Sequence, residues 1–355
     1  MAHEGVAVTT KKSNLAAGAL GLAVLLAGCG GGASGDDRTA GASAGDGPTF
    51  IYVTNTPIGI NKFLELGKVG TEAAAEEFDG TAKIYESTDD QSRRSNLEAA
   101  IAEQPDVIVL ITFDFEDMAK EYAERNPEQQ FLIVDACPAD GPENLRCAVF
   151  REQEASYLVG VEAGMLSESG KVGSVMALDI PFLHRYSDSF AAGAQSVDSA
   201  IDDSQLAIGG SNPFADPAKG KEQALSMAAT GVDQIFAVAS GSNGGVFEAA
   251  AEQGIYGYGV DINQCPMAPG YVVDNTMKAV DVLVVSEIGK ILDGKAERVT
   301  SYGLAEGGMD LTSLMEGAET SQCVVMEYPE VIERVKQVKQ DIIDGKIELP
   351  DPAAS

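Results

Sequence analysis

Residues 234–250 read QIFAVASGSNGGVFEAA. A short apolar run, 234–240, leads directly into a glycine-rich turn and then into a stretch with helical periodicity. Near-continuous hydrophobicity over so few residues is typical of a strand that is buried on both faces of a parallel sheet. A buried strand followed at once by a helix is the repeating unit of an α/β fold.

The same unit recurs along the chain from Thr49 onward. Helical stretches separate the apolar runs and are clearest at 90–103, 152–167, 216–230 and 276–293. The runs themselves are FIYVT (50–54), AKIYE (82–86), DVIVLIT (106–112), QFLIVDA (130–136), CAVF (147–150), KVGSVMAL (171–178), LAIGG (206–210), QIFAVAS (234–240) and YGYGVDI (256–262). About nine strands exceed one convenient sheet, so we predict an α/β protein with two doubly wound lobes.

The composition narrows the classes of function. The 355 residues include 24 Lys and Arg against 55 Asp and Glu, which gives a formal charge of -31. So acidic a protein repels a phosphate backbone, and we expect no nucleic acid partner. Only two histidines occur, His3 and His184. They offer little basis for a metal site or for histidine catalysis, and we predict neither.

The N-terminus has the features of an export signal. Lys11 and Lys12 precede an apolar run, 15–27, which is too short to span a bilayer. The sequence Leu26-Ala27-Gly28-Cys29, which begins within the end of this run, resembles the bacterial lipobox, in which the cysteine is lipidated. We therefore predict a lipoprotein signal peptide at 1–28, lipidation of Cys29, a flexible tether at 29–48 and an extracytoplasmic, membrane-anchored protein. The alternative is a plain export signal with an incidental cysteine.

Several strand ends carry longer motifs. These are VFREQEASYLVGVEAG (149–164), NPFADPAKGKEQA (212–224), VASGSNGGVFEAA (238–250) and GVD (259–261). Together they resemble the basic membrane protein family, the PnrA-like substrate-binding lipoproteins of ABC transporters, and the resemblance runs from Thr49 to about Gly345. The better-known members bind purine nucleosides. The resemblance implies a small-molecule ligand, an ABC permease as partner, no cofactor and no catalytic step.

The resemblance also implies a type I periplasmic-binding fold, with two Rossmann-like lobes joined by three crossings. We place the crossings near 150–152, 261–265 and 294–300. The first lobe is then 49–150 plus 266–295, and the second is 151–265 plus 296–350. In such folds the ligand lies outside the carboxyl ends of the strands.

Aromatic and acidic residues near those ends are the candidate ligand contacts. A nucleoside needs flat apolar walls and polar groups at two ends. The family pattern offers Phe63, Phe113 and Phe214 as walls, although each is also a plausible core residue. It offers Asp261 as an acceptor for sugar hydroxyls with Lys278 as its cationic companion, the alternative being a structural ion pair across the hinge.

Three further positions are candidates with alternatives. Asp135 ends the run QFLIVDA and is either an acceptor from the base edge or a loop cap. The turn at Gly241 either offers free N–H groups to ribose or is simply tight. The first loop reads GINKFLE (59–65) where family members commonly read Asp-Asp-Lys-Ser-Phe-Asn. Asn61 is the candidate in this loop for a hydrogen bond to the ligand. Because the loop differs, the alternatives to a purine nucleoside are a modified nucleoside, a free base or another small polar ring.

Four cysteines remain after Cys29. An even number in an exported protein suggests two disulfides, with three possible pairings. We favour Cys137 with Cys147, which are ten residues apart, and Cys265 with Cys323. Zinc is disfavoured because no Cys-x-x-Cys spacing occurs.

Two rival functions deserve comparison. A hydrolase would use a serine near Gly241 with His184 as base, but the Gly-x-Ser-x-Gly signature is missing, and we expect His184 in a surface loop. A sensor that hands its ligand to a membrane receptor would use the same fold. We predict a monomeric binding protein and not an enzyme.

Overall fold

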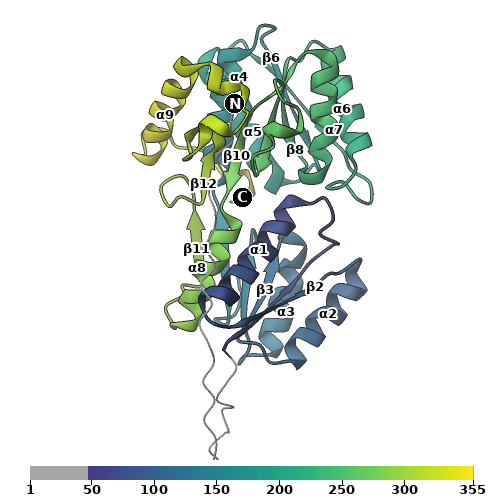
Figure 1. The fold of residues 1–355 in the computed structure, drawn as a ribbon, viewed down its shortest axis with the longest axis vertical. Coiled ribbons are helices and arrows are strands. Elements are labelled where there is room, and N and C mark those ends of the chain that lie inside the picture. Colours follow the sequence, from purple (N-terminus) through teal and green to yellow (C-terminus); the bar gives the residue numbers. More distant parts are fainter. Residues whose placement is uncertain (1–46, 355) are drawn as a thin grey trace, which may run out of the picture. The chain divides into compact units, whose positions relative to one another are not determined.

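The computed structural model describes residues 47–354. The predicted signal peptide, Cys29 and the tether up to residue 46 lie outside the described residues. Within 47–354 no helix is both long enough and apolar enough to cross a membrane. Strands and helices alternate along this part of the chain, and the strands form two sheets (Figure 1).

The first sheet has the strand order β2-β1-β3-β4-β5-β11 and is parallel throughout. Its strands are β1 (Thr49–Val53), β2 (Thr81–Tyr85), β3 (Val107–Ile111), β4 (Gln130–Val134), β5 (Leu145–Phe150) and β11 (Val299–Tyr302). Because β1 has β2 on one side and β3 on the other, the winding reverses there. Such a reversal opens a crevice at the carboxyl ends of the strands.

The second sheet repeats this arrangement with the order β12-β10-β9-β8-β6-β7. Its strands are β6 (Lys171–Met176), β7 (Asp202–Ala207), β8 (Gln234–Val238), β9 (Tyr256–Asp261), β10 (Val272–Lys278) and β12 (Met309–Leu311). All neighbours are parallel except β12, which runs antiparallel to β10. The winding reverses between β6 and β8, so both sheets confirm the predicted doubly wound α/β fold.

Helices cover both faces of the sheets. The first lobe shows this through β1, where Phe50 and Tyr52 belong to one hydrophobic core and Ile51 and Val53 belong to another. The helices are α1 (Lys62–Glu77), α2 (Asp90–Ala102), α3 (Glu116–Arg125), α4 (Glu152–Leu166), α5 (Pro181–Val197), α6 (Pro217–Ala229), α7 (Asn243–Gln253), α8 (Val280–Leu292) and α9 (Pro329–Ile343). Burial on both faces explains why the strands read as unbroken apolar runs.

In the second lobe α4 and α5 approach each other through two glycines. A Cβ atom on Gly160 would lie 2.1 Å from the carbonyl oxygen of Phe190, and one on Gly193 would lie 2.1 Å from that of Tyr157. Only glycine permits this backbone contact. The contact matters for the site because α4 and α5 carry Glu152, Phe182 and Tyr186, which are described below.

The observed sheets correct the predicted lobe boundaries at two places. The strand β10 lies in the second sheet, so the second crossing follows Lys278 and not Asp261. The strand β11 lies in the first sheet, so the third crossing follows Tyr302 and not residues 294–300. In Figure 1, α8 and β11 accordingly lie with the first sheet, while β10 lies with the second.

The strand β10 was not predicted from the sequence, because the residues at its centre are polar. Asp274, Asn275 and Thr276 are fully buried, although strands of this kind usually read as apolar runs. The side chain of Asn275 accepts from Gln264 N at 3.1 Å and donates to Thr312 Oγ1 at 3.0 Å. These hydrogen bonds let an amide take a place that a hydrophobic residue would normally fill.

The structure contains the two disulfides that the cysteine spacing favours. Cys137 is bonded to Cys147 and Cys265 to Cys323, with Cα atoms 5.4 and 4.9 Å apart. The second bond closes a loop of 58 residues, for which chain entropy gives a stabilisation of about 4 kcal/mol. It ties the segment before α9 to the end of β9.

A pair of buried carboxyl groups lies between α4 and β10. Glu162 and Asp274 are both inaccessible to solvent. Neither oxygen of Glu162 has a hydrogen-bond donor among the described residues, and Asp274 is its neighbour. A protonated Glu162 that donates to Asp274 satisfies both groups. Burial and the charge of Asp274 accordingly raise the pKa of Glu162 well above its ordinary value, and burial raises that of Asp274 to about 6.

This pair predicts a specific dependence of stability on pH. The pKa of Glu162 is higher in the folded state than in the unfolded chain. Its contribution to the free energy of unfolding is therefore complete below about pH 4.5. As the pH rises above that value, this contribution is lost by up to about 1.4 kcal/mol per pH unit. In Glu162→Gln the amide donates to Asp274 without titrating, so the melting temperature should fall less between pH 5 and pH 8. The exposed variant Glu168→Gln is the matched control and should follow the wild type. Equal slopes for all three proteins would contradict the shared proton.

Candidate ligand-binding site

A cavity of about 280 Å³ lies at the carboxyl ends of the strands of both sheets. Its walls come from the segments that follow β1, β3, β4, β6, β7 and β8, from the last residues of β9 and β10, and from the first turns of α1, α2 and α5. This is the place that the doubly wound topology predicts. Seven of the eight candidate residues line it: Asn61, Phe63, Phe113, Asp135, Phe214, Asp261 and Lys278.

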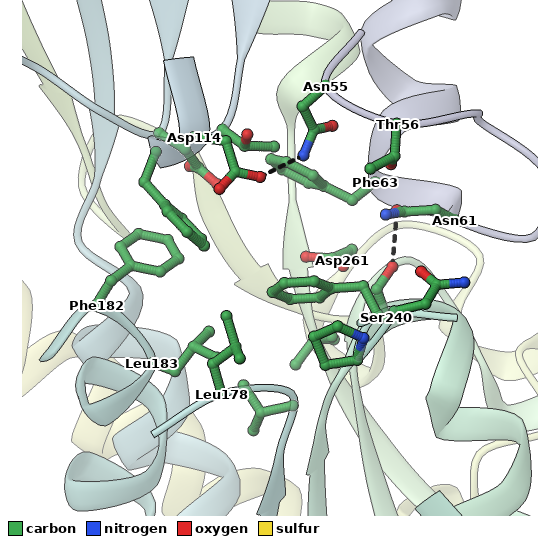
Figure 2. Close-up of a pocket in the computed structure, with 18 of the residues that line it drawn as sticks. Asn55, Thr56, Asn61, Phe63, Asp114, Leu178, Phe182, Leu183, Ser240 and Asp261 are labelled. Carbon is green, nitrogen blue, oxygen red and sulfur yellow. Dashed lines mark hydrogen bonds between the residues drawn. The ribbon is translucent and has the colours of Figure 1, made fainter. Parts of the chain in front are cut away.

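Aromatic rings form much of the wall. The ring centroid of Phe113 lies 5.6 Å from that of Phe182 and 6.4 Å from that of Phe214, at tilted angles of 46° and 51°. Phe182 in turn packs edge-on against Tyr186. The rings therefore form a continuous apolar surface that reaches from the first lobe to the second, and Figure 2 shows Phe63 on the side of the cavity opposite Phe182.

The strand ends at the cavity adopt a backbone conformation that side chains disfavour. In residues 47–354, seven residues other than glycine have positive φ, and four of them line the cavity. These are Thr112 at 94°, Asp135 at 73°, Ser240 at 46° and Asp261 at 71°. The left-handed region costs such residues roughly 1–2 kcal/mol. Strain of this kind concentrates at functional sites, where the surrounding fold holds the side chains in place.

The ammonium of Lys278 is buried between two carboxylates. Its Nζ lies 2.8 Å from Oδ1 of Asp135, which follows β4, and 2.9 Å from Oε1 of Glu152 at the start of α4. It also donates to the hydroxyl of Tyr186 at 3.1 Å. Burial lowers the pKa of Lys278, but the carboxylates raise it by more, so the pKa lies well above its ordinary value. The two carboxylates therefore favour the charged form of the ammonium.

This arrangement corrects one prediction. Lys278 was expected as the ionic companion of Asp261, whereas its direct partners are Asp135 and Glu152. The reason is the second crossing: Lys278 ends β10, where the chain turns back to the first lobe and meets the end of β4. The carboxylate of Asp135 is therefore paired with Lys278. Its Oδ2 accepts a hydrogen bond from Nζ of Lys278 at 3.0 Å.

Asp261, like the buried Glu162, receives no hydrogen bond from a described residue, but unlike Glu162 it faces the cavity. Its accessible fraction is 8% and it lines the cavity. Burial raises its pKa to about 7; Lys278 lowers the value, and Asp135 and Glu152 raise it further. A buried acceptor without a donor is costly. The carboxylate of Asp261 is accessible from the cavity, where hydroxyl or amino groups can donate to it.

The lobes also meet in a hydrogen bond at the rim of the cavity. Ser240 Oγ of the second lobe donates to Oδ1 of Asn61, 2.8 Å away in the first lobe (Figure 2). The same oxygen caps α1 by accepting from Leu64 N at 3.2 Å. The amide nitrogen of Asn61 is then the group that remains for a ligand.

Gly241 is the one candidate that does not line the cavity. A Cβ atom there would lie 2.8 Å from Cγ1 of Ile60 and 2.9 Å from the carbonyl oxygen of Phe214. Its role in the structure is to let Ile60 of the first lobe approach the second. The preceding residue, Ser240, faces the cavity in its place.

Several lining residues were not predicted. Asn55, Thr112, Asp114 and Arg93 form a polar end of the cavity in the first lobe. Asn55 Nδ2 donates to Asp114 Oδ2 at 2.6 Å (Figure 2), while Asn55 Oδ1, Thr112 Oγ1 and Arg93 Nε are buried without hydrogen-bond partners among the described residues. Asn55, Thr112 and Asp114 follow apolar runs, so the rule that ligands bind at strand ends could have found them. Arg93 lies in the first turn of the polar helix α2 and does not end a strand, so this rule could not have found it.

Phe182 and Tyr186 were also missed, because 181–184 was expected to be a surface loop. In the structure Pro181 starts α5, and the helix directs both rings to the cavity. His184 points elsewhere and pairs with Asp179 at 2.8 Å and Asp188 at 3.1 Å. His184 therefore lies in helix α5 and not in the surface loop that we expected.

Comparison with known proteins assigns the chain to a family. Residues 62–352 match the profile of the family described as ABC transporter substrate-binding protein PnrA-like. The protein belongs to the PnrA-like family. The type I periplasmic-binding fold agrees with this: the crystal structure of an ABC transporter solute-binding protein from Aeropyrum pernix K1 has a TM-score of 0.75 and 27% identity, over 86% of this chain and 94% of that one.

Named relatives of this PnrA-like protein are similar over most of their length. The CD4+ T-cell-stimulating antigen of Listeria innocua is 29% identical over 92% of this chain and 95% of its own. The ABC transporter nucleoside-binding protein BmpA of Lactococcus lactis is 29% identical over 76% of this chain and 79% of its own. Proteins of this family are extracytoplasmic solute-binding components of ABC transporters and not enzymes.

Removing the buried ammonium should destabilise this PnrA-like protein. Lys278→Met leaves the buried carboxylate of Asp135 without a direct cationic partner and Glu152 with Arg185 alone, and breaking such a buried pair typically costs about 3–5 kcal/mol. Urea unfolding at pH 7.5 measures the loss. The control is Lys68→Met, which removes an exposed pair with Glu72 at 3.8 Å and should cost at most about 1 kcal/mol. Equal small losses in both variants would contradict the structural role of the charge.

Proposed function

We propose that this protein captures a purine nucleoside between its lobes and presents it to an ABC permease. The observation that carries the proposal is Asp261, a buried carboxylate that lacks a donor among the described residues and lies in a cavity walled by phenylalanine rings. Vicinal sugar hydroxyls supply two donors to one carboxylate. A flat purine covers the rings, and stacking of a base on an aromatic ring is worth about 1–3 kcal/mol.

The polar end of the cavity suits the edge of the base. Asp114 has an oxygen beyond the one bound by Asn55, and Asn55 Oδ1 and Thr112 Oγ1 are buried acceptors without partners among the described residues. Purines carry ring N–H or amino groups that donate to such acceptors. Lys278 and Asp135 carry opposite charges and pair with each other, so the proposed ligand is uncharged.

Two further observations bear on the ligand class. The relative from Lactococcus lactis is named a nucleoside-binding protein, and this supports the same class here. The first loop lacks the acidic residue of the common family reading, and Asn61, the residue left there, has an amide oxygen that is already engaged by Ser240 and Leu64. We infer that the loop contributes less to the ligand than the rings and Asp261 do.

The same proposal includes how the protein is held and how it works. Lipidation of Cys29 anchors it to the outer face of the cell membrane, and residues up to 48 connect the anchor to β1. We propose that the protein acts as a monomer, with a cavity lined by residues of both lobes. Delivery requires that the lobes separate, which breaks the contacts of Lys278 with Asp135 and of Ser240 with Asn61.

Binding of nucleosides tests the proposal directly. Isothermal titration calorimetry with inosine, adenosine and guanosine should give micromolar dissociation constants, and each ligand should raise the melting temperature by mass action. Asp261→Asn should weaken binding by about 10- to 150-fold, since hydrogen bonds to charged groups contribute about 1.5–3 kcal/mol. Because the carboxylate must be ionised and its pKa is about 7, wild-type affinity should fall about tenfold per pH unit below that value.

The control variant is Asp117→Asn, an exposed residue of α3 that does not line the cavity. It should bind like the wild type at every pH. Ribose and amino acids should leave the melting temperature unchanged. Stabilisation by sugars or amino acids, with no effect of any nucleoside, would contradict the ligand class and leave the transport role intact.

The anchor requires a separate experiment. In a bacterial host that processes lipoproteins, the wild type should fractionate with membranes, and its N-terminal peptide should start at Cys29 with an increased mass from acyl chains. Cys29→Ser should be released into the soluble fraction because its polypeptide lacks the acyl chains that partition into lipid. Membrane retention of the serine variant would refute lipidation as the anchor.

A further inference from the structure

The end of the chain contacts the first turns of α5. The carboxylate of Asp351 accepts two hydrogen bonds from the guanidinium of Arg185, from Nε to Oδ1 at 2.7 Å and from Nη2 to Oδ2 at 2.8 Å. Its Oδ1 also accepts from Ala353 N at 2.9 Å. Two parallel hydrogen bonds fix the plane of the guanidinium as well as its position.

The remaining nitrogen of Arg185 reaches the ion pairs of the site. Its Nη1 donates to Oε2 of Glu152 at 3.2 Å, and the other oxygen of Glu152 lies 2.9 Å from Nζ of Lys278. Glu152 has no accessible surface. It therefore depends on one cation at each of its two oxygens, and Arg185 is the cation that does not line the cavity.

Arg185 also contacts the aromatic wall. Its guanidinium carbon lies 5.6 Å from the ring centroid of Phe182, which lines the cavity and packs against Phe113. A guanidinium over a ring stabilises the position of that ring. One arginine thus contacts both a buried carboxylate behind the site and a ring in its wall.

We propose that Arg185 and Asp351 are positioning residues for ligand binding, which hold Lys278 through Glu152 and Phe182 through direct stacking. Without Asp351 the guanidinium is free to turn toward solvent, since 16% of its side chain is already accessible. Glu152 then has Lys278 as its main partner and draws Nζ away from Asp135. The cavity loses the placement of an ammonium and of a ring, although neither is mutated.

The ligand readout of this inference rests on the proposed function, so the experiment has a second readout without ligand. Asp351→Asn removes the charge that holds Arg185. Glu348→Gln removes the same charge three residues earlier, at an exposed side chain for which the structure gives no ion pair or hydrogen bond. Both are made in the full chain and compared by titration calorimetry with inosine, and by hydrogen–deuterium exchange of peptides that cover 181–187.

We expect Asp351→Asn to weaken inosine binding by about five- to tenfold and to increase exchange at 181–187 in the ligand-free protein. Glu348→Gln should change neither, and Asp351→Glu should restore part of the affinity. Since Asp351 acts through Arg185, the double variant Arg185→Met, Asp351→Asn should bind no more weakly than Arg185→Met alone.

If the wild type binds a nucleoside, two results would overturn the proposal. One is a lower melting temperature for Asp351→Asn with unchanged affinity and unchanged exchange, which indicates a purely structural contact. Another is a double variant whose loss equals the sum of the two single losses, because Asp351 then acts independently of Arg185. If the wild type binds no nucleoside, the proposed function fails. The exchange data still decide the positioning claim, and unchanged exchange at 181–187 refutes it.

Discussion

One buried ammonium connects the parts of this protein that matter for its function. Lys278 ends a strand of the second sheet, and its partners are Asp135 at the end of a first-sheet strand and Glu152 at the start of α4. Taking such a charge out of water is tolerable only if opposite charges and hydrogen bonds surround it. The pairs that Lys278 makes with Asp135 and Glu152 meet that requirement and connect the two sheets at the cavity.

The ion pair also relates ligand binding to the movement of the lobes. Asp135 and Lys278 come from different sheets, so separating the lobes exposes both groups to water, where their attraction is weak. Asp261 lines the same cavity and receives no hydrogen bond from a described residue. On the proposed function, a nucleoside that donates to Asp261 would favour the arrangement in which Lys278 is enclosed. This is the coupling that a binding protein needs in order to present different shapes with and without its ligand.

Much of the fold was predictable from the sequence because burial on both faces leaves unbroken apolar runs. The strands β1, β3, β4 and β8 were located within a residue or two, and the strand-end rule together with the family resemblance led to seven cavity residues. The rule was applied unevenly, since Asn55 and Asp114 follow the same strands and were passed over. The polar strand β10 and the short strands β11 and β12 had no comparable signal, and two crossings were misplaced as a result.

The sequence by itself determined the alternation of strands and helices, the acidic charge and the edge of the sheets at which a ligand site had to lie. These follow from periodicity and composition, which are local properties of the chain. Only the tertiary structure decided that Lys278 pairs with Asp135 and Glu152, that Gly241 makes room for Ile60, and that Asp261 is left without a donor of its own. Each of these depends on groups that lie far apart in sequence, and whether a charged group is satisfied is settled by its neighbours in space.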